Sequence, residues 1–162
     1  MSDGDGRTVE QRLGDVGLTI PEPPKGAGNY VPYVVAGDLV FVSGQIPLIE
    51  GETVCSGQLG RDADMKRGVK AARACALNLL SHLKAACDGD LSRVVRVVRL
   101  GGFVSATPEF EQHPAVIDGA SELMIEAFGE AGRHARAAVG VASLPRGVSV
   151  EIDGIFQIAP AA

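Results

Sequence analysis

Apolar side chains recur at alternating gaps of four and three residues between Asp62 and Cys87, and this pattern predicts a long helix. The residues of this stripe are Met65, Val69, Ala72, Ala76, Leu79, Leu83 and Ala86. Such a stripe lies on one side of a helix and is buried against another layer of the fold. Asp62 or Asp64 can cap the first turn, and Gly89 can close the last one. The basic side chains of the segment lie off the stripe, where we expect a solvated face.

The segments around this helix alternate between strand and helix patterns. Tyr33–Ala36 and Leu39–Ser43 flank a Gly-Asp pair, which is typical of a β-hairpin. Val94–Val104 is rich in β-branched residues and predicts a buried strand, whereas Ala115–Gly129 predicts a second helix. Two more strands are expected after residue 134, so the order is β-β-α-β-α-β-β. We therefore expect an α+β fold with a single sheet and both helices on one of its faces.

The chain of 162 residues is most simply one domain with a substantial core. Residues 1–28 begin polar, give a short helical pattern and then reach Pro21, Pro23 and Pro24, which cannot continue a helix. We interpret residues 1–28 as an N-terminal arm and residues 29–162 as a single domain. A sheet with helices on one face and a half-polar second face favours a closed oligomer.

Composition disfavours several partners. A net charge of −5, two Tyr, five Phe and no Trp argue against nucleic acid, because basic side chains bind phosphates and aromatic ones stack on bases. No apolar run is long enough for a membrane span, and the polar N-terminus is unlike a signal peptide, so we expect a cytoplasmic protein.

Three cysteines without metal-type spacing predict free thiols. His82, His113 and His134 also lack ligand spacing, so no metal is expected.

Arg136 begins a strand whose small residues leave space around its side chain. Successive strand residues point to opposite faces, so Ala138 and Gly140 share the face of Arg136. A guanidinium with vacant volume in front of it can bind a small anion. The alternative is a structural ion pair at a sheet edge, a common role for charged strand residues.

The segment after this strand indicates which carboxylate joins it. Residues 144–147, Leu-Pro-Arg-Gly, are typical of a turn. If Ser143 pairs with Val148 across this turn, Gly140 lies opposite Glu151. We then expect the guanidinium, its small neighbours and the carboxylate to share one sheet face.

Two motifs in this chain resemble the Rid (reactive intermediate deaminase, or YjgF-like) family. The first is residues 42–47, Val-Ser-Gly-Gln-Ile-Pro, and the second is residues 136–152, which contain Leu-Pro-Arg-Gly and Val-Glu-Ile. The resemblance spans residues 29–158, and two motifs in the right order are more specific than either alone. It implies a chorismate-mutase-like fold, a homotrimer and ligand clefts between neighbouring subunits.

The resemblance also implies a site and a reaction. Arg136 matches the arginine that grips the carboxylate of a 2-imino or 2-enamino acid, and Glu151 matches the glutamate that orients the attacking water. Tyr30, Ser43 and Gly44 match residues that line the cleft. Each has a plain structural alternative: Tyr30 could cover the first hairpin, Ser43 could be a strand-end hydroxyl, and Glu151 an exposed carboxylate.

The chain departs from the family pattern in three places. Ala138 stands where short members carry a cysteine, a position that the family uses mostly through its backbone N–H. Asp118 stands in the place of an asparagine, where a carboxylate could repel an anionic substrate. Residues 107–121 are longer than in short members.

The resemblance and the residues together lead to one expected activity and two alternatives. We expect a cofactor-independent hydrolase that converts imino or enamino acids to 2-keto acids and ammonia. A trimeric small-molecule-binding or regulatory protein without catalysis is the first alternative. An endoribonuclease is the second, and the acidic charge balance fits it least.

Overall fold

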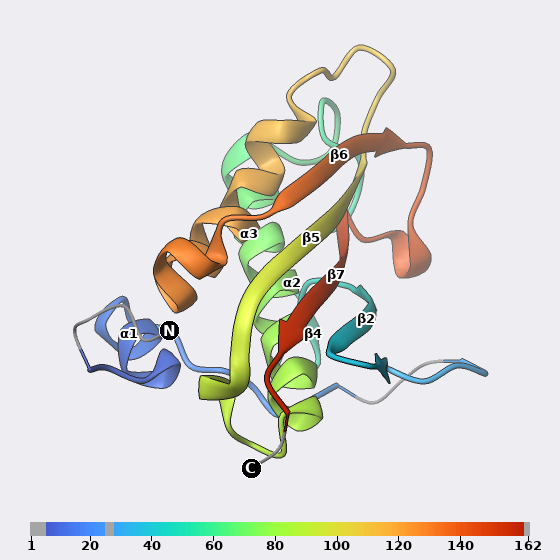
Figure 1. Ribbon diagram of the computed structural model, residues 1–162. Coiled ribbons are helices and arrows are strands. Elements are labelled where there is room, and N and C mark those ends of the chain that lie inside the picture. The colour runs from blue at the N-terminus through green and yellow to red at the C-terminus, as the bar shows by residue number, and fades with distance from the viewer. Residues whose placement is uncertain (1–5, 25–27, 161–162) are drawn as a thin grey trace.

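The computed structural model describes residues 6–24 and 28–160, and its main feature is a five-stranded mixed sheet. Helices α2 (Met65–Ala86) and α3 (His113–Phe128) cover one face of this sheet (Figure 1). Apolar side chains of both helices and of the facing strands form one continuous core. The predicted α+β arrangement, with both helices on one face, is confirmed.

The main sheet combines antiparallel and parallel neighbours. Its strands are β1 (Tyr33–Ala36), β2 (Leu39–Gln45), β5 (Val94–Ser105), β6 (Ala135–Val141) and β7 (Val150–Ile158). Their spatial order is β1-β2-β7-β5-β6, and only β5 and β6 run parallel to each other. A short hairpin of β3 (Leu48–Ile49) and β4 (Glu52–Thr53) lies outside this sheet and was not predicted.

Helix α2 begins and ends as the sequence predicts. The side chain of Asp64 accepts a hydrogen bond from the backbone N–H of Arg67 at 2.8 Å, which satisfies a donor of the first turn. Gly89 adopts a φ of 91° and closes the other end, with its N–H bonded to a carbonyl of the last turn. Between residues 74 and 83 every side chain is buried, because α3, the sheet and the β3 segment surround the helix.

The predicted N-terminal arm contains a helix that joins the core. Helix α1 (Val9–Asp15) starts at Thr8, whose side chain forms a capping box with Gln11. Val9 and Leu13 are buried against the core, and Leu13 is fully inaccessible. Residues 1–5 and 25–27 of the arm, and 161–162 of the predicted domain, lie outside the described residues.

The predicted pairing of Ser143 with Val148 is wrong, because β5 lies between β6 and β7. Residues 144–147 do form a turn, within the short 3-10 helix η3. The chain then crosses the end of β5 instead of closing a two-stranded hairpin. Gly140 and Glu151 therefore each pair with a residue of β5 rather than with each other.

The three cysteines are free, as their spacing predicts, and all three are buried. Burial raises the pKa of the Cys75 thiol well above its ordinary value, so this side chain is an un-ionised member of the core.

Within residues 6–24 and 28–160, no helix combines the length and apolar character that a membrane span needs.

Candidate functional site

Arg136 lies near the start of the edge strand β6 and points to the face of the sheet that the helices cover. It pairs in register with Leu100 of β5, which is fully buried on that face. Its Nη1 atom donates to Asp118 Oδ1 at 2.7 Å and to Ser121 Oγ at 3.0 Å, both on α3. One corner of the guanidinium is thus fixed against the helix.

The opposite edge of the Arg136 guanidinium is accessible. Among residues 6–24 and 28–160, no group forms a hydrogen bond with its Nε or Nη2 atom. Neither atom is sealed from solvent, and 22% of the side chain is exposed. The Nε–Nη2 edge is one with which a guanidinium can bind a carboxylate through two parallel hydrogen bonds. The structural ion pair, one of the two alternatives in the sequence, is therefore present, and the anion site at the other edge stays a prediction.

His134 extends this network on the far side of Ser121. Its Nδ1 lies 2.6 Å from the carbonyl oxygen of Gly132, which can only accept, so Nδ1 carries a proton. Burial lowers the pKa of His134, and the charge of Arg136 acts in the same direction, which favours the neutral ring. Nε2 then accepts the hydroxyl proton of Ser121 at 3.0 Å. The Ser121 oxygen is left as an acceptor for Arg136.

Glu151 belongs to a separate group of residues. It alternates along β7 with the buried Val150 and Ile152, so it leaves the sheet on the face opposite to that of Arg136. Together with Tyr30 and Gly44 it lines a pocket of about 440 Å³. Burial raises the pKa of the Glu151 carboxyl, and the nearby charge of Asp153 raises it further.

The absence of a side chain at Gly44 allows the Glu151 carboxylate to occupy its position in the pocket. A methyl group at this position would overlap Oε1 of Glu151, so the missing side chain makes the room that the carboxylate occupies. Ser43 acts on the pocket indirectly. Its Oγ donates to the carbonyl of Val31 at 2.8 Å, and its N–H donates to the carbonyl of Pro32 at 2.9 Å. Ser43 thereby anchors the segment that follows Tyr30.

One chain thus brings the predicted site residues together in two groups rather than one. Ala138 pairs with Gly102 and packs against the core on the face of Arg136, and Asp118 bonds to Arg136 itself. Tyr30, Gly44 and Glu151 form the second group. In the described part of the chain, no cluster of three His, Cys, Asp or Glu side chains could hold a metal ion.

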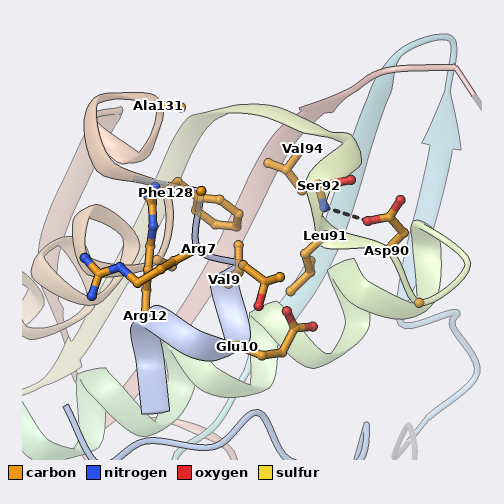
Figure 2. Close-up of a pocket in the computed structure, with 14 residues that line it drawn as sticks. Arg7, Val9, Glu10, Arg12, Asp90, Leu91, Ser92, Val94, Phe128 and Ala131 are labelled. Carbon is orange, nitrogen blue, oxygen red and sulfur yellow. Dashed lines mark hydrogen bonds between the residues drawn. The ribbon is translucent and has the colours of Figure 1, made fainter. Parts of the chain in front are cut away.

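A second cavity, of about 470 Å³, lies between α1, the 3-10 helix η1 (Leu91–Arg93) and the end of α3 (Figure 2). None of the predicted site residues lines it. The charged side chains at its rim are engaged locally, since Arg7 pairs with Asp15 and Glu10 pairs with Lys84. This cavity marks where the N-terminal helix joins the domain, and we do not place the site there.

Residues 10–150 match the family model described as "YjgF/chorismate mutase-like, putative endoribonuclease". The chain belongs to the Rid/YjgF family. The sequence resemblance drawn from the two motifs is therefore confirmed.

The names of the relatives of this Rid/YjgF protein differ in whether they state an activity. The chain is 45% identical to protein TCP17 of Trypanosoma cruzi over an alignment of 151 residues. This alignment covers 93% of this chain and 94% of TCP17. The crystal structure of Atu1372 from Agrobacterium tumefaciens, a protein of unknown function, matches with a TM-score of 0.89 at 48% identity, over 93% of this chain and 92% of Atu1372. A 2-iminobutanoate/2-iminopropanoate deaminase of Dermatophagoides farinae is 29% identical over 141 residues, covering 87% and 94% of the two chains.

Sequence patterns did not single out two residues beside Arg136 in this Rid/YjgF protein, Ser121 and His134. A signal for both was present in their spacing. His134 stands two residues before Arg136 and directly precedes strand β6, and Ser121 stands three residues after Asp118 on a helix. Both spacings place side chains on one face. The spacing between the histidines tests His134 only as a metal ligand, and it does not indicate a hydrogen bond to Ser121.

Proposed function

We propose that this protein is a cofactor-independent hydrolase of 2-imino or 2-enamino acids. The accessible Nε–Nη2 edge of Arg136 carries this proposal, because it offers a fixed and permanently charged fork for the substrate carboxylate. The name of the Dermatophagoides farinae relative supports the reaction class. The higher identity to TCP17 and Atu1372 leaves the particular substrate open.

The complete site, in this proposal, lies in a cleft between two copies of the chain within a homotrimer. Arg136 and Glu151 leave the sheet on opposite faces and are separated by β5, so a single chain does not direct both at one small ligand. The face of the sheet away from the helices also exposes large apolar side chains. Val34 is 50% exposed, Phe41 42% and Val139 45%. Such a patch supports burial against further copies.

In the proposed reaction, Arg136 holds the carboxylate while Glu151 of a neighbouring copy holds a water molecule beside the imine carbon. The water oxygen bonds to that carbon, the C=N π electrons move to nitrogen, and Glu151 takes a proton from the water. Glu151 returns this proton to the nitrogen, which gives a carbinolamine. Glu151 then passes the hydroxyl proton of the carbinolamine to the nitrogen, the C–N bond breaks, and ammonia leaves as the carbonyl forms. The raised pKa of Glu151 makes its carboxylate a better base for the first step and a usable acid for the second.

A turnover assay tests the proposal directly. Imino acids are generated freshly by an amino acid oxidase, and the release of ammonia and 2-keto acid is followed with and without the protein. We expect acceleration by wild type and none by Glu151→Gln, with 2-keto acid binding retained in this variant. Binding of keto acids by wild type without any acceleration would contradict the hydrolase and favour the non-catalytic binding protein.

A further inference from the structure

His82 is a buried imidazole whose hydrogen-bonding capacity is unused by the protein. It lies on α2 and is only 3% exposed. Among residues 6–24 and 28–160, no group forms a hydrogen bond or ion pair with its ring nitrogens. These nitrogens are not sealed by protein atoms either, since they are absent from the fully enclosed polar atoms that lack a partner. Buried polar groups are normally paired, so a ligand or water is the partner that this ring requires.

The surroundings of His82 direct it into the Glu151 pocket. Asn78, one helical turn earlier, donates to the carbonyl oxygens of Ile46 and Leu48, both at 3.0 Å. These bonds hold the 46–48 segment against α2 beside His82. Ile46, Leu48 and His82 all line the 440 Å³ pocket that contains Glu151.

The other groups of this pocket narrow the chemistry that His82 can recognise. Gln45 also lines the pocket, but its side-chain amide already donates to the carbonyl of Ser43 at 3.0 Å. Burial lowers the pKa of His82, so the ring is neutral and offers one N–H donor and one acceptor nitrogen. Two opposite charges, the carboxylate of Glu151 and the guanidinium of Arg146, also line the pocket, so its charges do not select an ionic group on the ligand and a neutral polar group suits the ring.

We propose that His82 is a specificity-determining residue that hydrogen-bonds a neutral polar substituent, a hydroxyl or a carboxamide, on the side chain of the ligand. This rests on the proposed function, because Arg136 and Glu151 are taken to hold the carboxylate and the reacting carbon. An aliphatic side chain displaces water from the pocket and leaves the imidazole unpaired, whereas a polar one satisfies it. The preferred substrates are then imino acids derived from hydroxy or amide amino acids.

Calorimetry with pairs of 2-keto acids of equal size tests this assignment. Hydroxypyruvate is compared with 2-oxobutanoate, and 2-oxosuccinamate with 4-methyl-2-oxopentanoate, on the purified full-length protein. We expect wild type to bind the polar member of each pair about tenfold more tightly, the typical net worth of one hydrogen bond. His82→Leu should remove or reverse the preference, and His82→Gln, which keeps a donor and an acceptor, should retain part of it.

The outcomes separate this inference from the function on which it rests. A wild-type preference below twofold, or one that His82→Leu leaves unchanged, overturns the role of His82 while the proposed function stands. Absence of binding for all four compounds, or affinities unchanged in Arg136→Ala, overturns the proposed function and this assignment with it. Thermal melts of each variant show whether the fold is retained, and His82→Gln provides the comparison if His82→Leu unfolds.

Discussion

Asp118 Oδ1 accepts a hydrogen bond from Arg136 Nη1 at 2.7 Å, so the cation proposed to bind the substrate already has an anionic partner. From the sequence alone, a carboxylate at this position is expected to repel an anionic substrate. The geometry adds a second effect, because Asp118 also holds the guanidinium in place. Ser121 shares this task, since it accepts from the same Nη1 atom.

Replacing Asp118 with Asn separates the two effects. Asn keeps an acceptor oxygen for Nη1 but removes the negative charge, so we expect the affinity for pyruvate to rise about threefold to tenfold. The modest size follows from the exposure of the Asp118 side chain, which is 54%. Calorimetry measures the change, and Glu122→Gln on the same helix controls for net charge. An unchanged or weaker affinity would mean that Asp118 acts through positioning alone.

Arg136→Lys should impair ligand binding nearly as much as Arg136→Ala. Lys keeps the charge but cannot hold Asp118 and Ser121 at one corner while presenting a planar fork to a ligand. Charge-assisted hydrogen bonds contribute about 1.5–3 kcal/mol each, so losing two removes measurable binding of pyruvate. Arg133→Lys, an exposed arginine three residues earlier, is the matched control and should bind as wild type does. Equal affinities in wild type and both Arg136 variants would make Arg136 purely structural.

RNA should bind weakly, although the family description includes an endoribonuclease. The net charge of −5 gives little attraction to a phosphate backbone, and several arginines are already engaged, such as Arg73 with Glu126. Filter binding and cleavage assays at about 50 and 200 mM salt measure this. Robust, salt-sensitive cleavage that disappears in Arg136→Ala would reverse the ranking of the two activities.

Gly44→Ala should reduce turnover without unfolding the protein. The added methyl overlaps Oε1 of Glu151, so the carboxylate must move away from its place in the pocket. We expect kcat to fall about tenfold to a hundredfold, as for other misplaced general bases, while keto acid affinity changes little. Gly14→Ala is the control, since a methyl group added there would meet nothing within 4 Å beyond its chain neighbours and the backbone of its own helix. Full activity in Gly44→Ala would show that the exact position of Glu151 does not matter.

The elements that could be predicted from the sequence are those that local patterns determine. The stripe between Asp62 and Cys87 gives α2, and the turn residues between Tyr33–Ala36 and Leu39–Ser43 give the first hairpin. The all-round burial of α2 could not be predicted, because it depends on segments far away in the chain. The burial of His82 could not be predicted for the same reason, because this residue lies outside the apolar stripe yet is almost inaccessible.

The relative positions of Arg136 and Glu151 could not be predicted from local patterns either, for a different reason. Alternation fixes the two faces of each strand but not its neighbour, so nothing in residues 136–152 indicated that β5 lies between them. Through β5, Gly140 is aligned with Val150 rather than with Glu151. This offset of one residue moves the carboxylate to the other face of the sheet, and it divides the predicted site into two groups.

The raised pKa of Glu151 predicts opposite effects of one substitution on activity and stability. The carboxylate is needed as a base, so hydrolysis should fall as the pH drops through a value above the ordinary glutamate pKa of 4.5. For stability the sign is reversed. A group whose pKa is raised by folding favours the folded state when protonated, and this contribution is lost as the pH rises through the folded-state pKa.

Glu151→Gln should therefore melt at a higher temperature than wild type at pH 7, where wild type holds a desolvated carboxylate near Asp153. The difference should vanish below the ordinary pKa, where Glu151 is protonated in both the folded and unfolded states. Thermal melts from about pH 3.5 to 8 measure it, and Glu109→Gln, on an exposed loop residue, is the control. A variant that is inactive yet no more stable at pH 7 would mean that burial does not raise the pKa of Glu151. The base would then have to ionise as an ordinary exposed carboxyl does.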